Sequence, residues 1–212
     1  MQTFTLFFLI TLFISMLTQF WLAARHIRHV SQHRDRIPEK FSSQISLADH
    51  QKAADYTCAK TRMEYLSILL HAALLLYLTL GGGLNALNQF WGAQFDDSLI
   101  QGMVLIISVF LITAVAEIPL SYYRTFVIEE QFGFNKMTPA MFLGDLFKKA
   151  SVGLLLAAPL LFGMLWSMEK MGEYWWVYAW IGWISFNLFV LAIFPTWIAP
   201  LFNKFTPLED AT

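Results

Sequence analysis

Five long apolar runs, separated by polar segments, dominate the sequence. They cover about residues 4–24, 65–87, 99–122, 150–168 and 175–198. An α-helix needs roughly 20 residues to cross the hydrocarbon core of a bilayer, and each run approaches or exceeds that length. The pattern predicts an all-α fold, a polytopic membrane helical bundle of about five transmembrane helices with helical excursions on the cytoplasmic side.

The composition supports a lipid environment. Of the 212 residues, 57% are hydrophobic and 14% are charged, whereas a soluble domain has roughly 45–50% apolar and about 25% charged residues. No basic residue precedes the first run, which is also longer than the apolar core of a signal peptide, so we interpret it as a retained anchor. The net charge of -1 gives no indication of a nucleic-acid partner.

Basic residues are segregated along the chain. Of the 14 Lys and Arg residues, all but Lys170 lie in the segments 25–64, 123–149 and 199–212. By the positive-inside rule these segments are cytoplasmic and the N-terminus lies outside. We therefore predict a multi-pass membrane protein, with the bilayer as its first partner.

Two helix starts are visible between the runs. Ser46 and Asp49 have the spacing of a capping box, which predicts a helix that begins near Leu47 and continues into the second run. Thr138 followed by Pro139 predicts a second start, because a proline at the first helical position has no N–H to leave unsatisfied. The short amphipathic helix 140–149 should lead into the fourth run from the membrane surface.

Two ionisable residues lie within the apolar runs. Glu117 is near the inner end of the third run, and His71 is inside the second. Ionisable groups at membrane depth usually face protein or a water-filled cavity, so both are candidate intramembrane polar sites. For Glu117 two alternatives remain open: it reaches interfacial water, or it pairs with Arg124. His71 could simply bond a neighbouring helix.

Three histidines, His26, His29 and His33, share one predicted helical face after the first run. Their spacing is compatible with a metal site. Arginines surround them, however, and positive charge opposes a cation while it favours anionic lipid headgroups. We therefore interpret this segment as a juxtamembrane surface.

The segment between the third and fourth runs carries the sequence RTFVIEEQFGFNKMT at 124–138. Glu129 and Glu130 are adjacent, so on a helix their side chains point about 100° apart and do not readily coordinate the same ion. Gly133 next to Phe134 suits a tight turn with positive φ, and Asn135 can bond its own backbone. These residues predict an ordered cytoplasmic loop, in which docking is favoured over catalysis.

Three separated motifs occur in one order: ISLADHQKAADYTCAKTR at 45–62, RTFVIEEQFGFNKMT at 124–138 and APLFNKFTPLED at 199–210. With them the chain resembles the N-terminal part of the Ste24-like CAAX prenyl proteases, the M48 family of membrane zinc metalloproteases, in the bacterial branch. That branch implies a bacterial inner (cytoplasmic) membrane. The resemblance implies a helical barrel around a water-filled chamber. It also implies a zinc ion held by the two histidines of a His-Glu-x-x-His helix and by a glutamate further along, with the motif's own glutamate as general base.

The sequence departs from that family pattern at the zinc motif. No histidine here is followed by Glu-x-x-His, and the last histidine is His71. No catalytic residue and no metal ligand is therefore assigned to this chain, and we expect it to be inactive alone. Zinc, and a peptide or membrane-protein substrate, are implied for the full-length family.

The leading hypothesis is the chamber-forming N-terminal membrane domain of a zinc metalloendopeptidase. Residues 1–198 would be the transmembrane domain, and 199–212 would begin a linker toward a catalytic zinc domain, supplied downstream or by a separate chain. The ending LEDAT falls inside a motif-like segment, as the end of a fragment would. The loop of Glu129, Glu130, Gly133, Phe134 and Asn135 would pack on the catalytic part. The alternatives are a stand-alone scaffold or pseudoenzyme partner, and a transporter or channel subunit.

Overall fold

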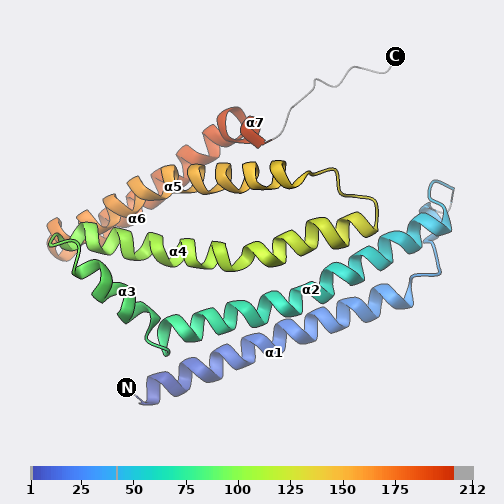
Figure 1. The fold of residues 1–212 in the computed structure, drawn as a ribbon, viewed down its shortest axis with the longest axis horizontal. Coiled ribbons are helices and arrows are strands. Elements are labelled where there is room, and N and C mark those ends of the chain that lie inside the picture. The colour runs from blue at the N-terminus through green and yellow to red at the C-terminus, as the bar shows by residue number, and fades with distance from the viewer. Residues whose placement is uncertain (1, 42, 203–212) are drawn as a thin grey trace. The chain divides into compact units, whose positions relative to one another are not determined.

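The computed structural model describes residues 2–41 and 43–202, and its secondary structure over these ranges is entirely helical (Figure 1). The α-helices are α1 (Gln2–Gln32), α2 (Leu47–Thr79), α3 (Gly83–Gly92), α4 (Ser98–Tyr123), α5 (Pro139–Lys170), α6 (Trp175–Ile193) and α7 (Ala199–Phe202). Shorter 3₁₀ elements are η1 (Glu39–Phe41) and η3 (Gly172–Tyr174), and π-helices are η2 (Arg124–Glu129) and η4 (Phe194–Ile198). The all-α prediction is confirmed.

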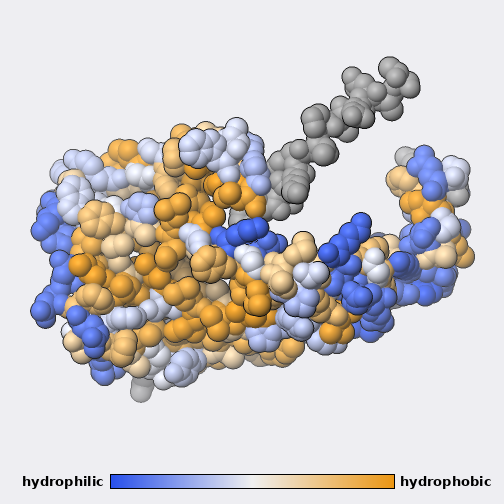
Figure 2. Space-filling model, turned by 45° about the horizontal axis from the view of Figure 1, so that its top comes forward, coloured by the Kyte–Doolittle hydropathy of each residue, from blue (hydrophilic) through white to orange (hydrophobic). Residues whose placement is uncertain are grey.

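Four helical stretches are long and apolar enough to cross a membrane: Thr3–Gln32, Ser98–Glu129, Pro139–Lys170 and Gly172–Leu201. At most 6% of the residues in the apolar window of each are buried inside the chain. Figure 2 shows broad hydrophobic areas on the face that it draws. Such side chains are stable when lipid covers them, because no water then surrounds the apolar surface.

The second predicted run is broken. α2 ends at Thr79, α3 begins at Gly83, and the two helices are bent by 54°. Gly82 between them has a φ of +81°, a left-handed conformation that glycine adopts without steric cost. Three consecutive glycines also weaken the helix, at about 1 kcal/mol each relative to alanine. The pair α2 and α3 therefore forms a broken span or a re-entrant segment, where the sequence predicted a single run at 65–87.

Other helices extend past the apolar runs. α1 continues to Gln32, eight residues beyond the expected end at 24. α5 is one helix that includes both the expected surface helix 140–149 and the fourth run. The hydrophobic runs locate only the lipid-facing part of each helix, because the hydrogen bonds of the backbone continue into polar sequence.

Both predicted helix starts are confirmed. The Ser46 hydroxyl accepts a hydrogen bond from the backbone N–H of Asp49 at 3.1 Å, and α2 runs unbroken from Leu47 to Thr79. The Thr138 hydroxyl accepts from the N–H of Met141 at 3.2 Å, with Pro139 as the first residue of α5. Each cap satisfies one of the N–H groups that a helix leaves without a partner.

The chain divides into two compact units, and we describe each by itself. The first contains Met1–Leu87 and Ser108–Met137. In it α1 packs along α2, with the rings of Phe20 and Tyr65 5.5 Å apart between centroids. Beyond the end of α1, the guanidinium of Arg34 donates two hydrogen bonds of 2.8 Å to the Asp55 carboxylate. The hydrogen bonds that Arg34 donates to Asp55 raise the pKa of Arg34 above its ordinary value, so this pair remains charged.

The second unit contains Asn88–Ile107 and Thr138–Thr212. Its main packing is between α5 and α6, which are joined by η3 with Gly172 at a φ of +58°. Ser167 and Ala179 are buried there, and the small side chains let the two helices approach closely. The aromatic residues at the start of α6 are largely exposed, which suits a membrane–water interface.

We predict that Arg34 and Asp55 are energetically coupled across α1 and α2. Arg34→Gln and Asp55→Asn should each lower the midpoint of thermal unfolding in detergent, and the double variant should lose no more than the larger single loss. Tryptophan fluorescence on the four proteins of the double-mutant cycle measures the coupling. Asp96→Asn, which removes an exposed carboxylate elsewhere, is the control. Additive losses from the two single changes would contradict the coupling.

Candidate functional site

The segment 124–138 begins as a π-helix. α4 passes directly into η2, which ends at Glu129. Single π-turns are rare and occur often at functional sites, since the extra residue shifts the side chains that follow around the helix. Ile128 in η2 is buried, and η2 contacts α2. The two glutamates are thus placed at the end of a helix that packs on its neighbour.

A Schellman motif ends this helix. Gly133 has a φ of +67°. The N–H of Phe134 donates to the carbonyl of Glu129 at 2.8 Å, and the N–H of Gly133 donates to the carbonyl of Glu130 at 2.9 Å. These two bonds satisfy the last helical carbonyls, and the left-handed residue between them is most easily a glycine. The segment is therefore a capped helix C-terminus, which agrees with the tight turn expected at Gly133.

The two carboxylates have different surroundings. The side-chain N–H of Asn135 donates to Glu130 Oε2 at 3.0 Å, while Asn135 Oδ1 accepts from the backbone N–H of Met137 at 2.7 Å. Glu130 and Asn135 therefore hold the shape of the loop. The Glu129 carboxylate has no hydrogen bond or ion pair with any residue that the structure describes. The two adjacent glutamates therefore differ in their contacts within the described part of the chain.

The phenylalanines of the loop contact α2. The ring of Tyr56 lies edge-on to Phe132 and Phe134, with centroids 5.5 and 4.9 Å apart. The Nζ of Lys52 lies 5.0 Å from the centroid of Phe134, and the Nζ of Lys60 lies 5.1 Å from that of Tyr56. Such aromatic and cation–π contacts contribute about 0.5–1.5 kcal/mol each. This cluster fixes the loop on α2.

Sequence reasoning did not connect Tyr56, Lys52 or Lys60 with this loop. A signal was present, because Tyr56 is four residues from each lysine and so shares a helical face with both. Nothing local in the sequence indicated that the Phe-Gly-Phe turn would cover that face. Phe134 nevertheless remains 47% exposed, so the cluster still presents a surface.

The two intramembrane candidates are partners. His71 Nε2 and Glu117 Oε1 are 2.6 Å apart, between α2 and α4. His71 contacts Glu117, and Tyr56 contacts Phe132. His71 is 15 positions after Tyr56, and Glu117 is 15 positions before Phe132, so one antiparallel register of the two helices explains both contacts. Of the alternatives left open for Glu117, the pairing with Arg124 is not found among the described residues. The His71 side chain is 52% exposed and that of Glu117 is 42% exposed.

Arg124 lies two turns beyond Glu117. Its Nε atom is buried and has no hydrogen-bond partner within the described part of the chain. A guanidinium has five N–H donors that need acceptors. Arg124, the first residue of η2, thus has a buried N–H donor that no described residue satisfies.

A metal site is not formed by the described residues. Over residues 2–41 and 43–202, no group of three or more His, Cys, Asp and Glu side chains is arranged to hold a metal ion. The rings of His29 and His33 are 4.3 Å apart between centroids, but His33 Nδ1 is 2.8 Å from the carbonyl oxygen of His29. These residues do not fit the ligand set of a catalytic zinc.

Comparison with known proteins supports the sequence resemblance. The family described as CAAX prenyl protease N-terminal, five membrane helices, matches residues 26–204. The CAAX prenyl protease 1 homolog of Arabidopsis thaliana is 29% identical over 188 residues, which is 82% of this chain and 43% of that protein. The homolog of Mus musculus is 30% identical over 195 residues, or 88% of this chain and 41% of that protein.

A solved structure shows the same fold. The crystal structure of S. mikatae Ste24p matches with a TM-score of 0.79 and 24% identity, covering 95% of this chain and 48% of that chain. The chain therefore spans about two fifths of the length of these curated relatives and about half of the solved one. Because the family match covers most of the sequence, this chain belongs to the CAAX prenyl protease N-terminal family, whose members have five membrane helices.

Proposed function

We propose that this chain is the membrane-embedded part of a zinc metalloendopeptidase of the CAAX prenyl protease type, and that it forms a wall of the chamber in which a peptide is cut. The proposal rests on the share of each relative's length that this chain matches. The relatives match more than four fifths of this chain with only about two fifths of their own length. The remaining length of such a protein has room for the catalytic part.

In this proposal zinc is bound outside the 212 residues. The sequence has no His-Glu-x-x-His, and the described residues do not fit a zinc site. The ligands would come from a downstream segment or from a separate chain, and zinc would supply the activated water there. This chain would position the catalytic part. It would hold that part at the membrane and would separate the substrate from lipid.

A polar surface within the membrane helices supports the role of a chamber wall. A hollow of about 450 Å³ lies between α1 and α2. Its lining includes polar side chains, namely Gln19, His26, Thr61, Glu64, Ser67 and His71. Polar side chains are costly against lipid, so a face of this kind is stable when it borders water or protein.

We further propose that the segments 25–64 and 123–149 face the cytoplasm of a bacterial inner membrane, with the N-terminus outside. Support comes from the charge distribution. The contact of Tyr56 with Phe134 supports it too, because it holds parts of both segments at one end of α2. We propose residues 1–198 as the transmembrane domain. Of the proposed linker 199–212, α7 (Ala199–Phe202) is described and residues 203–212 lie outside the described residues.

The loop of Glu129, Glu130, Gly133, Phe134 and Asn135 is our proposed docking surface for the catalytic part. Phe134 is exposed on one side and fixed by Tyr56 on the other. The Glu129 carboxylate carries a charge with no described partner. A rigid helix end with one exposed aromatic ring and one uncommitted charge loses little entropy when it binds, which favours docking.

We predict that zinc and peptidase activity accompany the native assembly and are absent from the isolated 212-residue chain. The native protein would be captured from membranes through an epitope in segment 25–64, and its intact mass, zinc content and peptide hydrolysis would be measured. The activity should be lost with a chelator and restored by added zinc. A captured protein with the mass of this chain alone and without a co-purified peptidase would contradict the proposal. A separate His-Glu-x-x-His chain at its side would assign the scaffold role instead.

We predict different effects for the two adjacent glutamates. Glu129→Gln should leave the thermal stability of the isolated chain unchanged, because the carboxylate has no described partner. It should weaken association with the catalytic part about tenfold, the lower range for a charged hydrogen bond. Glu130→Gln should lower stability slightly, because Asn135 loses a charged acceptor. Association is measured by titration of the separately expressed parts in detergent, with Glu173→Gln as a control. Equal association of Glu129→Gln and the unaltered chain would refute the docking role.

We predict that His71 and Glu117 stabilise the packing of α2 against α4. Glu117→Gln or His71→Leu alone should lower the free energy of unfolding by about 0.6–2 kcal/mol, the range for polar contacts between membrane helices. Changing both residues to leucine should recover part of the loss, since no polar group is then left unpaired. Unfolding in detergent with increasing denaturant measures the effect. A double-leucine variant less stable than both single variants would contradict the pairing.

A further inference from the structure

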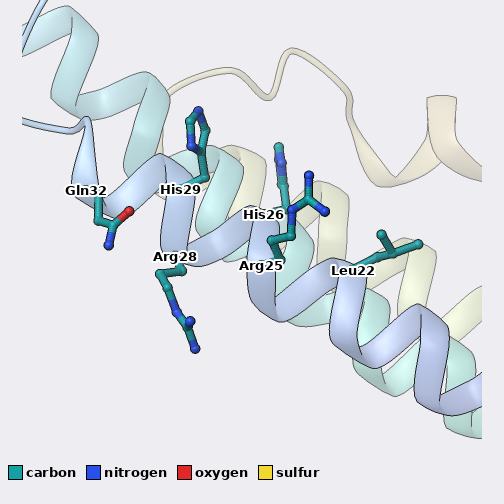
Figure 3. A pocket seen from close by; sticks show the side chains of 6 residues that line it. All are labelled: Leu22, Arg25, His26, Arg28, His29 and Gln32. Atoms are coloured by element: carbon teal, nitrogen blue, oxygen red, sulfur yellow. The ribbon is translucent and has the colours of Figure 1, made fainter.

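The polar end of α1 carries a basic hollow of about 530 Å³. It is lined by Leu22, Arg25, His26, Arg28, His29 and Gln32, all of them exposed and none of them acidic. In Figure 3 the side chains of Arg25, His26 and His29 project to one side of α1, and that of Arg28 projects to the other. The basic hollow therefore favours a negatively charged group.

The donors of the basic hollow are not used within the described part of the chain. The Arg25 guanidinium lies 5.4 Å from the centroid of the Trp21 ring, and a cation–π contact of this kind needs no hydrogen-bond acceptor. Among the residues that the structure describes, the side chains of Arg25, His26 and Arg28 form no hydrogen bond or ion pair. Since a guanidinium has five N–H donors, the hollow keeps its hydrogen-bonding capacity for another molecule.

The position of the basic hollow makes it accessible from water. The exposed ring of Trp21 favours the level of the lipid headgroups, and the hollow extends from Leu22 to Gln32, away from the apolar sequence before Trp21. At the helical rise this span is about 15 Å long. An extended peptide advances roughly 3.3 Å per residue, so about four of its residues match the length of the hollow.

The basic hollow adjoins the groove between α1 and α2, with which it shares Leu22 and His26. On the membrane side this groove is lined by Gln19, Ser67 and His71. Polar side chains there oppose the acyl chains of a lipid, but they suit a peptide, whose backbone N–H and C=O groups need partners away from water. A molecule that continues from the hollow into the groove is therefore better matched by a peptide than by a phospholipid.

The groove and the basic hollow differ in charge. Glu64 is the one acidic residue in the lining of the groove, and it does not line the hollow. Like charges repel, so a carboxylate is disfavoured beside Glu64 and favoured beside Arg25. A peptide bound along both would have its acidic side chains in the hollow and other side chains in the groove.

We propose that the basic hollow binds an acidic segment of the peptide substrate, while the neighbouring residues of that peptide enter the groove. Arg25 would donate two parallel N–H bonds to one carboxylate, and the imidazole N–H groups of His26 and His29 would donate to another. The inference rests on the proposed function, because it takes the groove to be a chamber wall. To that function it adds the substrate class: peptides with an acidic segment next to uncharged residues.

The first test measures peptide binding by the native assembly after elution from its capture antibody. A chelator is present so that hydrolysis does not interfere. Fluorescent peptides of equal length differ only in one pair of residues, which is Glu, Gln or Lys, and anisotropy measures their affinity. The Glu peptide should bind about fivefold more tightly than the Gln peptide, the upper range for an exposed ion pair, and the Lys peptide most weakly. Equal affinities would overturn the inference.

Variants locate the preference on the surface. Arg25→Gln should remove most of the preference for the Glu peptide, whereas Arg36→Gln, which removes the same charge outside the basic hollow, should retain it. Equal losses in the two variants would indicate general electrostatic attraction and refute the site. Thermal unfolding of each variant identifies a loss caused by misfolding. In that case Arg25→Lys replaces Arg25→Gln and should retain part of the preference, because it keeps the charge and loses the paired donors.

Peptide hydrolysis separates the two ways in which the inference can fail. Without the chelator, the assembly should cut the Glu peptide with the highest kcat/KM. An assembly that cuts all three peptides with equal kcat/KM would overturn the inference alone and leave the proposed function in place. An assembly that cuts none of them would contradict the proposed function, and the inference with it.

An anionic lipid is the competing occupant of the basic hollow. Phosphatidylglycerol or phosphatidylcholine is added in equal amounts to the detergent micelles that hold the assembly and the bound Glu peptide. The peptide should stay bound with either lipid. Displacement by phosphatidylglycerol and not by phosphatidylcholine would assign the hollow to lipid headgroups and overturn the peptide assignment.

Discussion

The antiparallel packing of α2 against the end of α4 and η2 is the constraint on which the polar features of the first unit depend. A single register places His71 against Glu117 at membrane depth and Tyr56 against Phe132 and Phe134 at the polar end. A polar group in lipid is costly without a partner, so the pair inside the membrane can form only if the register is correct. The loop then has a fixed position because α2 continues as one helix past the expected membrane boundary.

The loop combines two kinds of rigidity. Its backbone is fixed by the Schellman motif at Gly133, and its side chains are fixed on α2 by the aromatic cluster. Glu130 and Asn135 are used within the loop itself. Glu129 is left with an uncommitted charge on an ordered surface. We propose that this ordered surface is the place at which a second folded part is held.

Charge is also arranged along α1. The Trp21 and Arg25 pair marks the headgroup level, and the Arg34 and Asp55 pair ties the polar ends of α1 and α2 together. Between these two levels lie the exposed His29 and His33, and the groove with Glu64 extends from His26 toward the membrane. The arrangement fits a helix pair that passes from lipid, through the headgroups, into water, where each level has its own type of side chain.

The all-α class, the apolar runs, the caps at Ser46 and Thr138 and the tight turn at Gly133 could all be predicted from the amino-acid sequence. These are local properties: hydrophobic run length, hydrogen bonds within a few residues and the backbone freedom of glycine. It also identified His71 and Glu117 as unusual, because charge within an apolar run is visible without any structure. The family resemblance rested on three local motifs, and the family match over residues 26–204 supports it.

The contacts between residues far apart in the sequence could not be predicted and became visible in the folded chain. The partner of Glu117 is His71, 46 positions earlier, and not Arg124 on its own helix. Phe134 packs on Tyr56, which no pattern in the loop could indicate. The break between α2 and α3 was hidden because an apolar run shows where lipid lies and not whether the helix stays straight. Contacts between helices depend on the register and rotation of both, and these are set by the packing of whole faces, which no single segment of sequence contains.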